Sequence, residues 1–235
     1  MFTLSRKGEH IQAMFGSIAS RYDLLNRLLS FGVDTRWRRF AVSLVRSPAD
    51  GCILDIATGT GDMALEIAAT TPSSVSIVGI DFCKEMIEIA AMKTERSEYA
   101  ERINYAIAPC EAIPFPDGSF DSVTIAFGIR NLDNRIQGLR EMYRILKTGG
   151  KVIILEFSTP RSKIIKVIYH WYFRRLLPII GGLFSRFDAY KYLPDSVLEF
   201  PAQAEFKHTM AEAGFLNLVH YTRTFGIVSI YVGEK

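Results

Sequence analysis

The sequence predicts a doubly wound α/β fold with a mostly parallel, seven-stranded sheet. Short apolar runs rich in β-branched residues alternate with helical patterns between residues 52 and 157. Runs that are apolar on both faces belong in parallel strands with helices on each side. The last two apolar runs are separated only by Thr224-Phe225-Gly226. Because this link is too short for a crossover helix, the two strands must form an antiparallel hairpin.

The first 48 residues are predicted to form a helical cap, the start of a single 235-residue domain. Apolar residues recur at helical spacing across Ile11–Ile18. Asp23 can cap a second helix, and Asp34 or Thr35 can cap a third. These helices precede the first predicted strand, so we expect them to lie against the sheet rather than within it.

Residues 50–157 are predicted to form the α/β core, which binds the ligand. The predicted strands are Cys52–Ala57, Val75–Ile80, Ile103–Ile107, Ser122–Phe127 and Val152–Phe157. The helices expected between them are Met63–Ala69, Lys84–Lys93 and Gln137–Leu146. Each strand is followed by a turn at one edge of the sheet, where open α/β folds bind their ligands.

The C-terminal part divides into an insertion and the hairpin region. Residues 158–200 are predicted to form a helical insertion in which Arg161–Phe187 carries six Lys or Arg and no Asp or Glu. Residues 201–235 contain the hairpin strands Leu216–Arg223 and Ile227–Gly233. We expect the insertion to lie over the edge of the sheet where the strands end.

The composition argues against several classes of protein. A net charge of +3 is small for a nucleic-acid binder, so no such partner is expected. The three cysteines and four histidines show neither a C-x-x-C pair nor a metal-ligand spacing, so no metal site is expected. No apolar run follows Lys7, and Leu176–Ser185 is a charge-free apolar stretch of only ten residues, whereas a membrane-spanning helix needs about 20. We expect a cytoplasmic protein.

The strongest local motif is the glycine loop LDIATGTGD, Leu54–Asp62. It places Asp55 at the end of a buried strand, followed by Gly59-Thr60-Gly61 and a helix. Gly59, Gly61 and Ala64 also satisfy the G-x-G-x-x-A pattern of NAD-type oxidoreductases. In such a site, however, the carboxylate of Asp55 would face an anionic pyrophosphate. S-adenosylmethionine carries a cationic sulfonium and an ammonium instead, so the loop favours this cofactor.

Later strand ends extend this predicted cofactor site. Asp81 closes the second strand twenty residues after Gly61, where a carboxylate can bind both ribose hydroxyls; capping the next helix is its alternative role. The turn Ala108–Glu111 is expected against the adenine, and Ala126–Gly128 close to the sulfonium.

Four segments outside the glycine loop carry a family resemblance. They are YDLLNRLLSFGVDTRW (Tyr22–Trp37), FGIRNLDN (Phe127–Asn134), ILKTGGKVIILEFSTP (Ile145–Pro160) and YLPDSVLEFP (Tyr192–Pro201). The chain thereby resembles the ubiquinone/menaquinone biosynthesis C-methyltransferases over nearly its whole length. The resemblance implies a Rossmann-like, class I S-adenosylmethionine-dependent methyltransferase. Its substrate would be the ring of a reduced polyprenyl quinone, either demethylmenaquinol or a methoxy-polyprenyl-benzoquinol.

The resemblance also implies cofactor contacts at Thr60, Asp81, Pro109-Cys110 and Ala126. The family usually has Asn or Asp and then Ala in the adenine turn, where this chain has Pro109-Cys110. Glu111 or backbone carbonyls would then bind the adenine amino group. The family commonly has Ser in place of Ala126. It also has His where this chain has Asp34, so no histidine can act as a base there.

Carbon methylation requires a group that favours the ionised phenol of the acceptor. Arg130, with Asn131, is the candidate, because arginine cannot readily lose its proton but can stabilise a phenolate or orient water. The alternative is an ordinary ion pair of Arg130 with Asp133 or Glu141. Tyr22 and Asp34 are expected to complete the substrate pocket, or else to serve in packing and capping.

The basic, aromatic segment Arg161–Phe187 bears on the polyprenyl tail. Arg, Trp and Tyr interleaved with Ile and Leu suit a lipid surface. We expect transient contact with the inner face of the cytoplasmic membrane; a helical lid over the sheet is the alternative. Apolar helices in this half are also compatible with a homodimer. Other functions left open are methylation of another small acceptor, NAD-linked oxidoreduction and a non-catalytic scaffold role in quinone biosynthesis.

Overall fold

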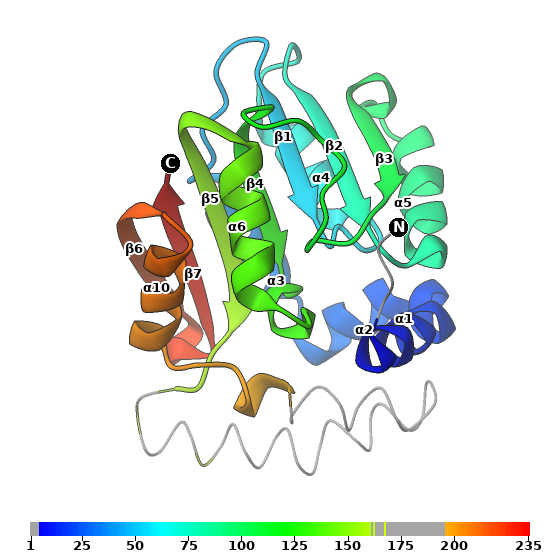
Figure 1. Ribbon diagram of the computed structural model, residues 1–235. Coiled ribbons are helices and arrows are strands. Elements are labelled where there is room, and N and C mark those ends of the chain that lie inside the picture. Colours follow the sequence, from blue (N-terminus) through cyan, green and yellow to red (C-terminus); the bar gives the residue numbers. More distant parts are fainter. Residues whose placement is uncertain (1–4, 161, 163–166, 168–195) are drawn as a thin grey trace.

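Seven strands form one sheet in the order β3-β2-β1-β4-β5-β7-β6 in the computed structural model, which describes residues 5–160, 162, 167 and 196–235 (Figure 1). The strands are β1 (Cys52–Ile56), β2 (Ser76–Asp81), β3 (Ile103–Ile107), β4 (Phe120–Ala126), β5 (Leu146–Phe157), β6 (Leu216–Arg223) and β7 (Val228–Glu234). The first five are parallel, and β7 pairs antiparallel with both β5 and β6. The predicted doubly wound sheet with a C-terminal hairpin is confirmed.

Helices cover both faces of the sheet. One face packs against α3 (Asp34–Val42) and α4 (Asp62–Thr70), and the other against α6 (Arg135–Ile145) and α10 (Gln203–Glu212). Alternation along β1 explains the two cores, because Ile53 belongs to the first and Leu54 to the second. α5 (Lys84–Glu95) lies against β2 and β3.

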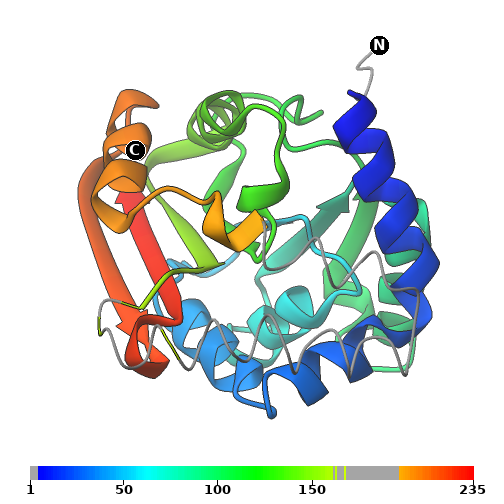
Figure 2. The same cartoon turned by 90° about the horizontal axis from the view of Figure 1, so that it is seen from below.

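The N-terminal cap consists of α1 (Arg6–Ile18), α2 (Tyr22–Leu29) and α3, with the 3-10 turn Ala19–Arg21 between the first two. These helices lie at the carboxyl ends of the strands, which face the viewer in the view from below (Figure 2). The sequence prediction placed this cap correctly as a helical unit before the first strand.

The predicted helix caps are wrong. α2 begins at Tyr22, so Asp23 lies inside its first turn, and α3 begins at Asp34 after an N-cap at Val33 without a side-chain hydrogen bond. The turn Ala19–Arg21 leads straight from α1 into α2, which removes the free helix start that Asp23 would have capped. Asp23 instead binds other elements, and Asp34 pairs with Arg38 one turn further along α3, as described below.

β5 is longer than predicted, because its pairing with β4 begins at Leu146, which the prediction assigned to the preceding helix. A register shift between Phe120 and Ser122 accompanies this early pairing. Most of the predicted helical insertion at 158–200 lies outside the described residues. Within the described part of the chain, no helix has the length and apolar content to cross a bilayer.

Truncation of Phe206 on α10 tests the packing of the hairpin against the core. Its ring is fully buried, with its centroid 4.8 Å from those of Phe200 and Tyr231. Phe206→Ala is expected to lower the free energy of unfolding by about 3–5 kcal/mol, measured by denaturant titration. Leu216→Ala on the exposed side of β6 is the control, and we expect it to change stability by less than about 0.5 kcal/mol. Equal losses in the two variants would contradict this account of the core.

Candidate functional site

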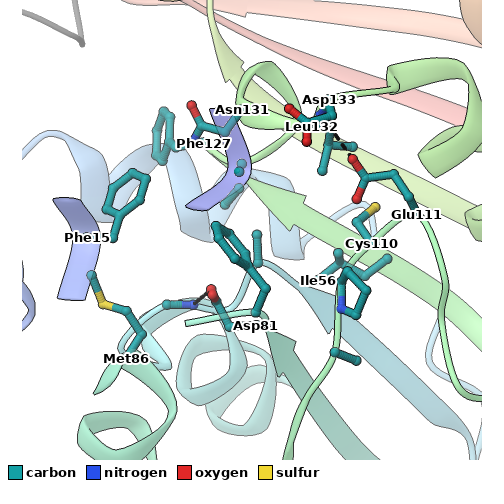
Figure 3. Close-up of a pocket in the computed structure, with 18 of the residues that line it drawn as sticks. Phe15, Ile56, Asp81, Met86, Cys110, Glu111, Phe127, Asn131, Leu132 and Asp133 are labelled. Carbon is teal, nitrogen blue, oxygen red and sulfur yellow. Dashed lines mark hydrogen bonds between the residues drawn. The ribbon is translucent and has the colours of Figure 1, made fainter. Parts of the chain in front are cut away.

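A cavity with about 750 Å³ of empty space, part of it open to solvent, lies at the carboxyl ends of β1, β2, β3 and β4 (Figure 3). α1 and the start of α2 close it from the side of the cap. Its lining residues are Gly8, Phe15, Tyr22, Ile56, Ala57, Gly59, Asp81, Phe82, Met86, Ala108, Pro109, Cys110, Glu111, Ala126, Phe127, Gly128, Asn131, Leu132 and Asp133. The cavity therefore combines four strand ends with the N-terminal cap.

The backbone is strained where β1 and β4 end at this cavity. Ala57 and Phe127 have φ of +49° and +57°, in the left-handed region that side chains disfavour. Such strain concentrates at functional sites. A Cβ at Gly128 would lie 2.6 Å from that of Ala57, so the two turns require glycine there. At Gly59, in contrast, an added Cβ would meet only Tyr22, at 3.9 Å, which leaves room for a ligand to approach the backbone.

Asp81 occupies the position expected for a ribose ligand. Its Oδ2 accepts a hydrogen bond from the backbone N–H of Gly59 at 2.9 Å, and its Oδ1 accepts one from that of Cys83 at 2.9 Å. Burial raises the pKa of Asp81 to about 6, although these N–H groups oppose the shift. An ionised carboxylate has lone pairs left after two bonds, so Asp81 can also accept bonds from ligand hydroxyls.

Three other residues expected at the cofactor belong to the glycine loop but are not part of the cavity lining. Asp55 is fully buried, and its two oxygens accept hydrogen bonds from Thr58 and Thr124 at 2.6 Å each. Burial raises the pKa of Asp55 to about 7.

Thr60 and Gly61 complete this group. The hydroxyl of Thr60 donates to Asp23 of α2. Gly61 packs so closely on α5 that an added Cβ would lie 3.1 Å from that of Ala90. In the described structure these residues shape the loop from behind.

The expected adenine turn does line the cavity, as does Ala126. Glu111 is engaged there: its Oε1 accepts the backbone N–H of Asp133 at 3.0 Å and that of Asn134 at 3.5 Å. It therefore ties the adenine turn to the segment after β4. Burial raises the pKa of Cys110 far above its usual range, so this thiol is neutral.

The structure separates the two predicted catalytic residues. Asn131 lines the cavity, whereas Arg130 does not and is 5% exposed. The expected ion-pair partners of Arg130 were wrong, because its Nη1 bonds to Glu156 Oε1 at 2.8 Å. Its backbone N–H also donates to Glu156 Oε2 at 3.2 Å, and Nη1 donates to the carbonyl of Phe127. Arg130 thus fixes the turn that carries Asn131.

The two predicted substrate residues also differ. Tyr22 lines the cavity, with its ring edge-on to Phe15. Burial raises the pKa of Tyr22, so its hydroxyl remains a hydrogen-bond donor. Asp34 lies away from the cavity lining, 3% exposed, where it binds Arg38 and accepts a bond from Ser30 Oγ at 2.6 Å. A direct contact of Asp34 with substrate does not fit this placement.

Sequence reasoning missed the apolar wall of the cavity. Phe15 of α1 and Phe82 and Met86 after β2 line it. Phe82 and Met86 could have been found, because Phe82 directly follows Asp81 and Met86 lies four residues further on, in the first turn of α5. Phe15 could not, because an apolar residue at helical spacing is equally consistent with the core.

Charge indicates what this cavity accepts. Among the described lining residues, Asp81, Glu111 and Asp133 are acidic and none is Lys or Arg. A pyrophosphate would meet only negative charge here, whereas a cationic ligand is favoured. Asp81 fits the ribose of S-adenosylmethionine, and the apolar surfaces of Phe82 and Met86 fit its adenine. The open space at Gly59 lets the ligand pass close to the backbone of the glycine loop.

Comparison with known proteins agrees with this chemistry. The chain matches the ubiE/COQ5 methyltransferase family over residues 3–235. It is 65% identical, over the full length of both chains, to a ubiquinone/menaquinone biosynthesis C-methyltransferase of Geotalea uraniireducens. It is 48% identical to the demethylmenaquinone methyltransferase of Thermus thermophilus, over 94% of this chain and all of that protein.

Solved structures share the fold at low identity. A methyltransferase of Aquifex aeolicus that depends on S-adenosylmethionine superposes with a TM-score of 0.58 at 15% identity, over 80% of this chain and 84% of that one. The [4+2]-cyclase SpnF reaches a TM-score of 0.72 at 14% identity, over 99% and 97% of the two chains. A cyclase and a methyltransferase on one fold illustrate that the fold alone does not set the reaction.

Asp81→Asn tests the ribose ligand. We expect affinity for S-adenosylhomocysteine, measured by calorimetry, to fall roughly 10- to 100-fold, because bonds to a charged acceptor are lost. In the parent protein the ionised form of Asp81 accepts these bonds more strongly than the protonated form, so affinity should fall as the pH drops through about 6. The variant should lose that part of the pH dependence. The exposed Asp117→Asn is the control, and an unchanged pH profile in Asp81→Asn would exclude the assignment.

Proposed function

This chain belongs to the ubiE/COQ5 methyltransferase family, and on that premise we propose that it methylates a ring carbon of a reduced polyprenyl quinone. The first acceptor to test is demethylmenaquinol, because a demethylmenaquinone methyltransferase matches nearly the whole chain. Relatives named for both quinone pathways make a methoxy-polyprenyl-benzoquinol a second acceptor to test. The acidic cavity at the strand ends is the observation on which this proposal rests.

When bound, S-adenosylmethionine would supply a methyl group to the attacking ring carbon: the carbon–methyl bond forms as the methyl–sulfur bond breaks, S-adenosylhomocysteine leaves, and the methylated ring carbon then loses its proton. The protein then has mainly to align the two reactants, which can contribute about 7–11 kcal/mol. Asp81 and the Gly59 backbone would hold the nucleoside end, and the turn at Pro109-Cys110 the adenine. Ala126, at the end of β4, would lie close to the methyl group.

The acceptor would bind between this cofactor site and the N-terminal cap. A quinol carbon attacks well only when the neighbouring oxygen carries negative charge or a strong hydrogen bond. Tyr22 and Asn131 line the cavity and have donors for that oxygen. We assign Arg130 a positioning role: bound to Glu156, it would hold Asn131 against the acceptor. The apolar side chains of Phe15, Phe127 and Leu132 would surround the ring.

A polyprenyl tail prefers the lipid phase, so we propose transient contact with the inner face of the cytoplasmic membrane. Residues 161–187, on which this expectation rests, are basic and aromatic in sequence but lie almost wholly outside the described residues. In the described part, Leu24 and Leu28 of α2 are 60% and 40% exposed, and the same helix supplies Tyr22 to the cavity. This arrangement supports a tail that leaves the cavity near the cap.

The reaction itself is tested with labelled S-adenosylmethionine and four short-chain acceptors: a demethylmenaquinol, the matching benzoquinol and both oxidised quinones. We expect a methylated product from one or both quinols and none from the quinones, because only the reduced ring has an electron-rich carbon. Binding of the cofactor without methylation of any acceptor would overturn the quinone assignment.

Membrane contact is tested by flotation with anionic phospholipid vesicles. We expect binding at low salt that weakens as salt is raised, because basic residues each contribute about 1 kcal/mol near such a surface. The double variant Arg174→Glu with Arg175→Glu should reduce binding to these vesicles by at least about tenfold, because it removes two such contributions. Lys84→Glu on the exposed face of α5 is a single charge reversal outside this segment and should have little effect. Absence of binding at low salt would exclude the proposed contact.

A further inference from the structure

Five charged side chains behind the glycine loop connect the N-terminal cap to the α/β core. At their centre, Lys93 Nζ of α5 donates to Asp23 Oδ2 of α2 at 2.7 Å and to Asp62 Oδ1 of α4. The second oxygen of Asp62 pairs with Arg38 Nη2 of α3 at 3.0 Å, and Arg38 pairs in turn with Asp34. Lys93 thus joins a helix of the cap to the helix that follows the glycine loop.

This network holds the glycine loop at its middle and at its C-terminal end. Asp23 Oδ1 accepts the hydroxyl hydrogen bond of Thr60, in the middle of the loop. Asp62 is the first residue of α4, directly after Gly61. Because Lys93 binds both carboxylates, the position of the loop and the position of α2 are set together.

The same contacts are linked through the chain to the acceptor wall, the side of the cavity formed by Phe15 and Tyr22 of the cap. Asp23 directly follows Tyr22, which lines the cavity. Lys93, Asp23 and Asp62 themselves lie outside the described lining. Any effect they have on the reaction is therefore exerted through the loop and the cap.

Burial and charge favour a cation at the position of Lys93, between Asp23 and Asp62. The side chains of Lys93, Asp23 and Asp62 are 28%, 27% and 20% exposed, so water screens them only in part. Burial by itself raises the pKa of Asp62, but the charges of Arg38 and Lys93 hold it below its usual range. Without Lys93, two ionised carboxylates would face each other across the site that its ammonium fills.

We propose that Lys93 is a positioning residue for cofactor binding, because it clamps α2 of the cap and α4 around the glycine loop. The clamp sets the approach of a ligand to the Gly59 backbone. This role rests on use of the cavity by S-adenosylmethionine and does not depend on which acceptor is methylated.

The test is Lys93→Met (K93M), which keeps the aliphatic stem and removes the charge. We expect the Kd for S-adenosylhomocysteine and the KM for S-adenosylmethionine to rise at least about tenfold, with kcat at saturating cofactor changed less than about threefold. Lys93→Arg retains the charge and should restore most of the affinity. Lys84→Met on the same helix, which removes the exposed pair with Glu88, should leave both constants unchanged.

A second change separates positioning from simple stabilisation. Asp23→Asn removes one of the facing carboxylates, and its side-chain oxygen can still accept the bond from Thr60. Added to K93M, it should recover much of the lost cofactor affinity. If K93M lowers Tm but leaves the Kd unchanged, or if Asp23→Asn gives no recovery, the network only stabilises the fold and the proposal is wrong. If the parent protein itself binds no S-adenosylhomocysteine, the proposed function fails instead.

Discussion

A fully buried carboxylate joins the parts of this protein that form the cavity. Asp55 ends β1 and accepts hydrogen bonds from Thr124 of β4 and Thr58 of the glycine loop. The order in which successive strands are added to the sheet reverses between β1 and β4. Open α/β sheets form their ligand-binding crevice at this switch point. Asp55 therefore links the two strands that border the crevice. The strained turns at Ala57 and Phe127 directly follow these two strands.

The distribution of charge follows from this arrangement. Acidic groups line the cavity, whereas the nearby cations are engaged elsewhere: Arg130 with Glu156, and Arg38 and Lys93 with the aspartates behind the loop. The cations thus act on the protein's own carboxylates and leave a negative surface for a cationic ligand. In physical terms, one set of charges stabilises the walls and another selects what they enclose.

The N-terminal cap couples the two halves of the site. Its helices contribute Phe15 and Tyr22 to the cavity and Asp23 to the back of the loop. The indole N–H of Trp37 donates to Thr224 Oγ1 at 2.8 Å, so the cap also contacts the turn of the C-terminal hairpin. A segment that precedes the sheet in sequence is thereby fixed to both of its edges, and the acceptor wall is built on the same elements as the cofactor wall.

Much of this protein follows from its sequence alone. Apolar runs of strand length, interrupted by helical patterns, determine the parallel sheet, and the three-residue link Thr224–Gly226 determines the hairpin. The glycine loop and Asp81 locate the cofactor site, because the ends of parallel strands meet at one edge. The four further segments identify the family, which motif chemistry by itself does not.

Only the tertiary structure decides how the individual polar residues are used. Asp23 has the sequence context of a helix cap, yet it binds Lys93, which lies 70 residues away and is brought to it by packing. Arg130 pairs with Glu156, 26 residues away on the neighbouring strand, and not with the nearby acids. A side chain's local pattern states what it can bind, whereas burial and the choice among distant partners depend on how the whole chain packs.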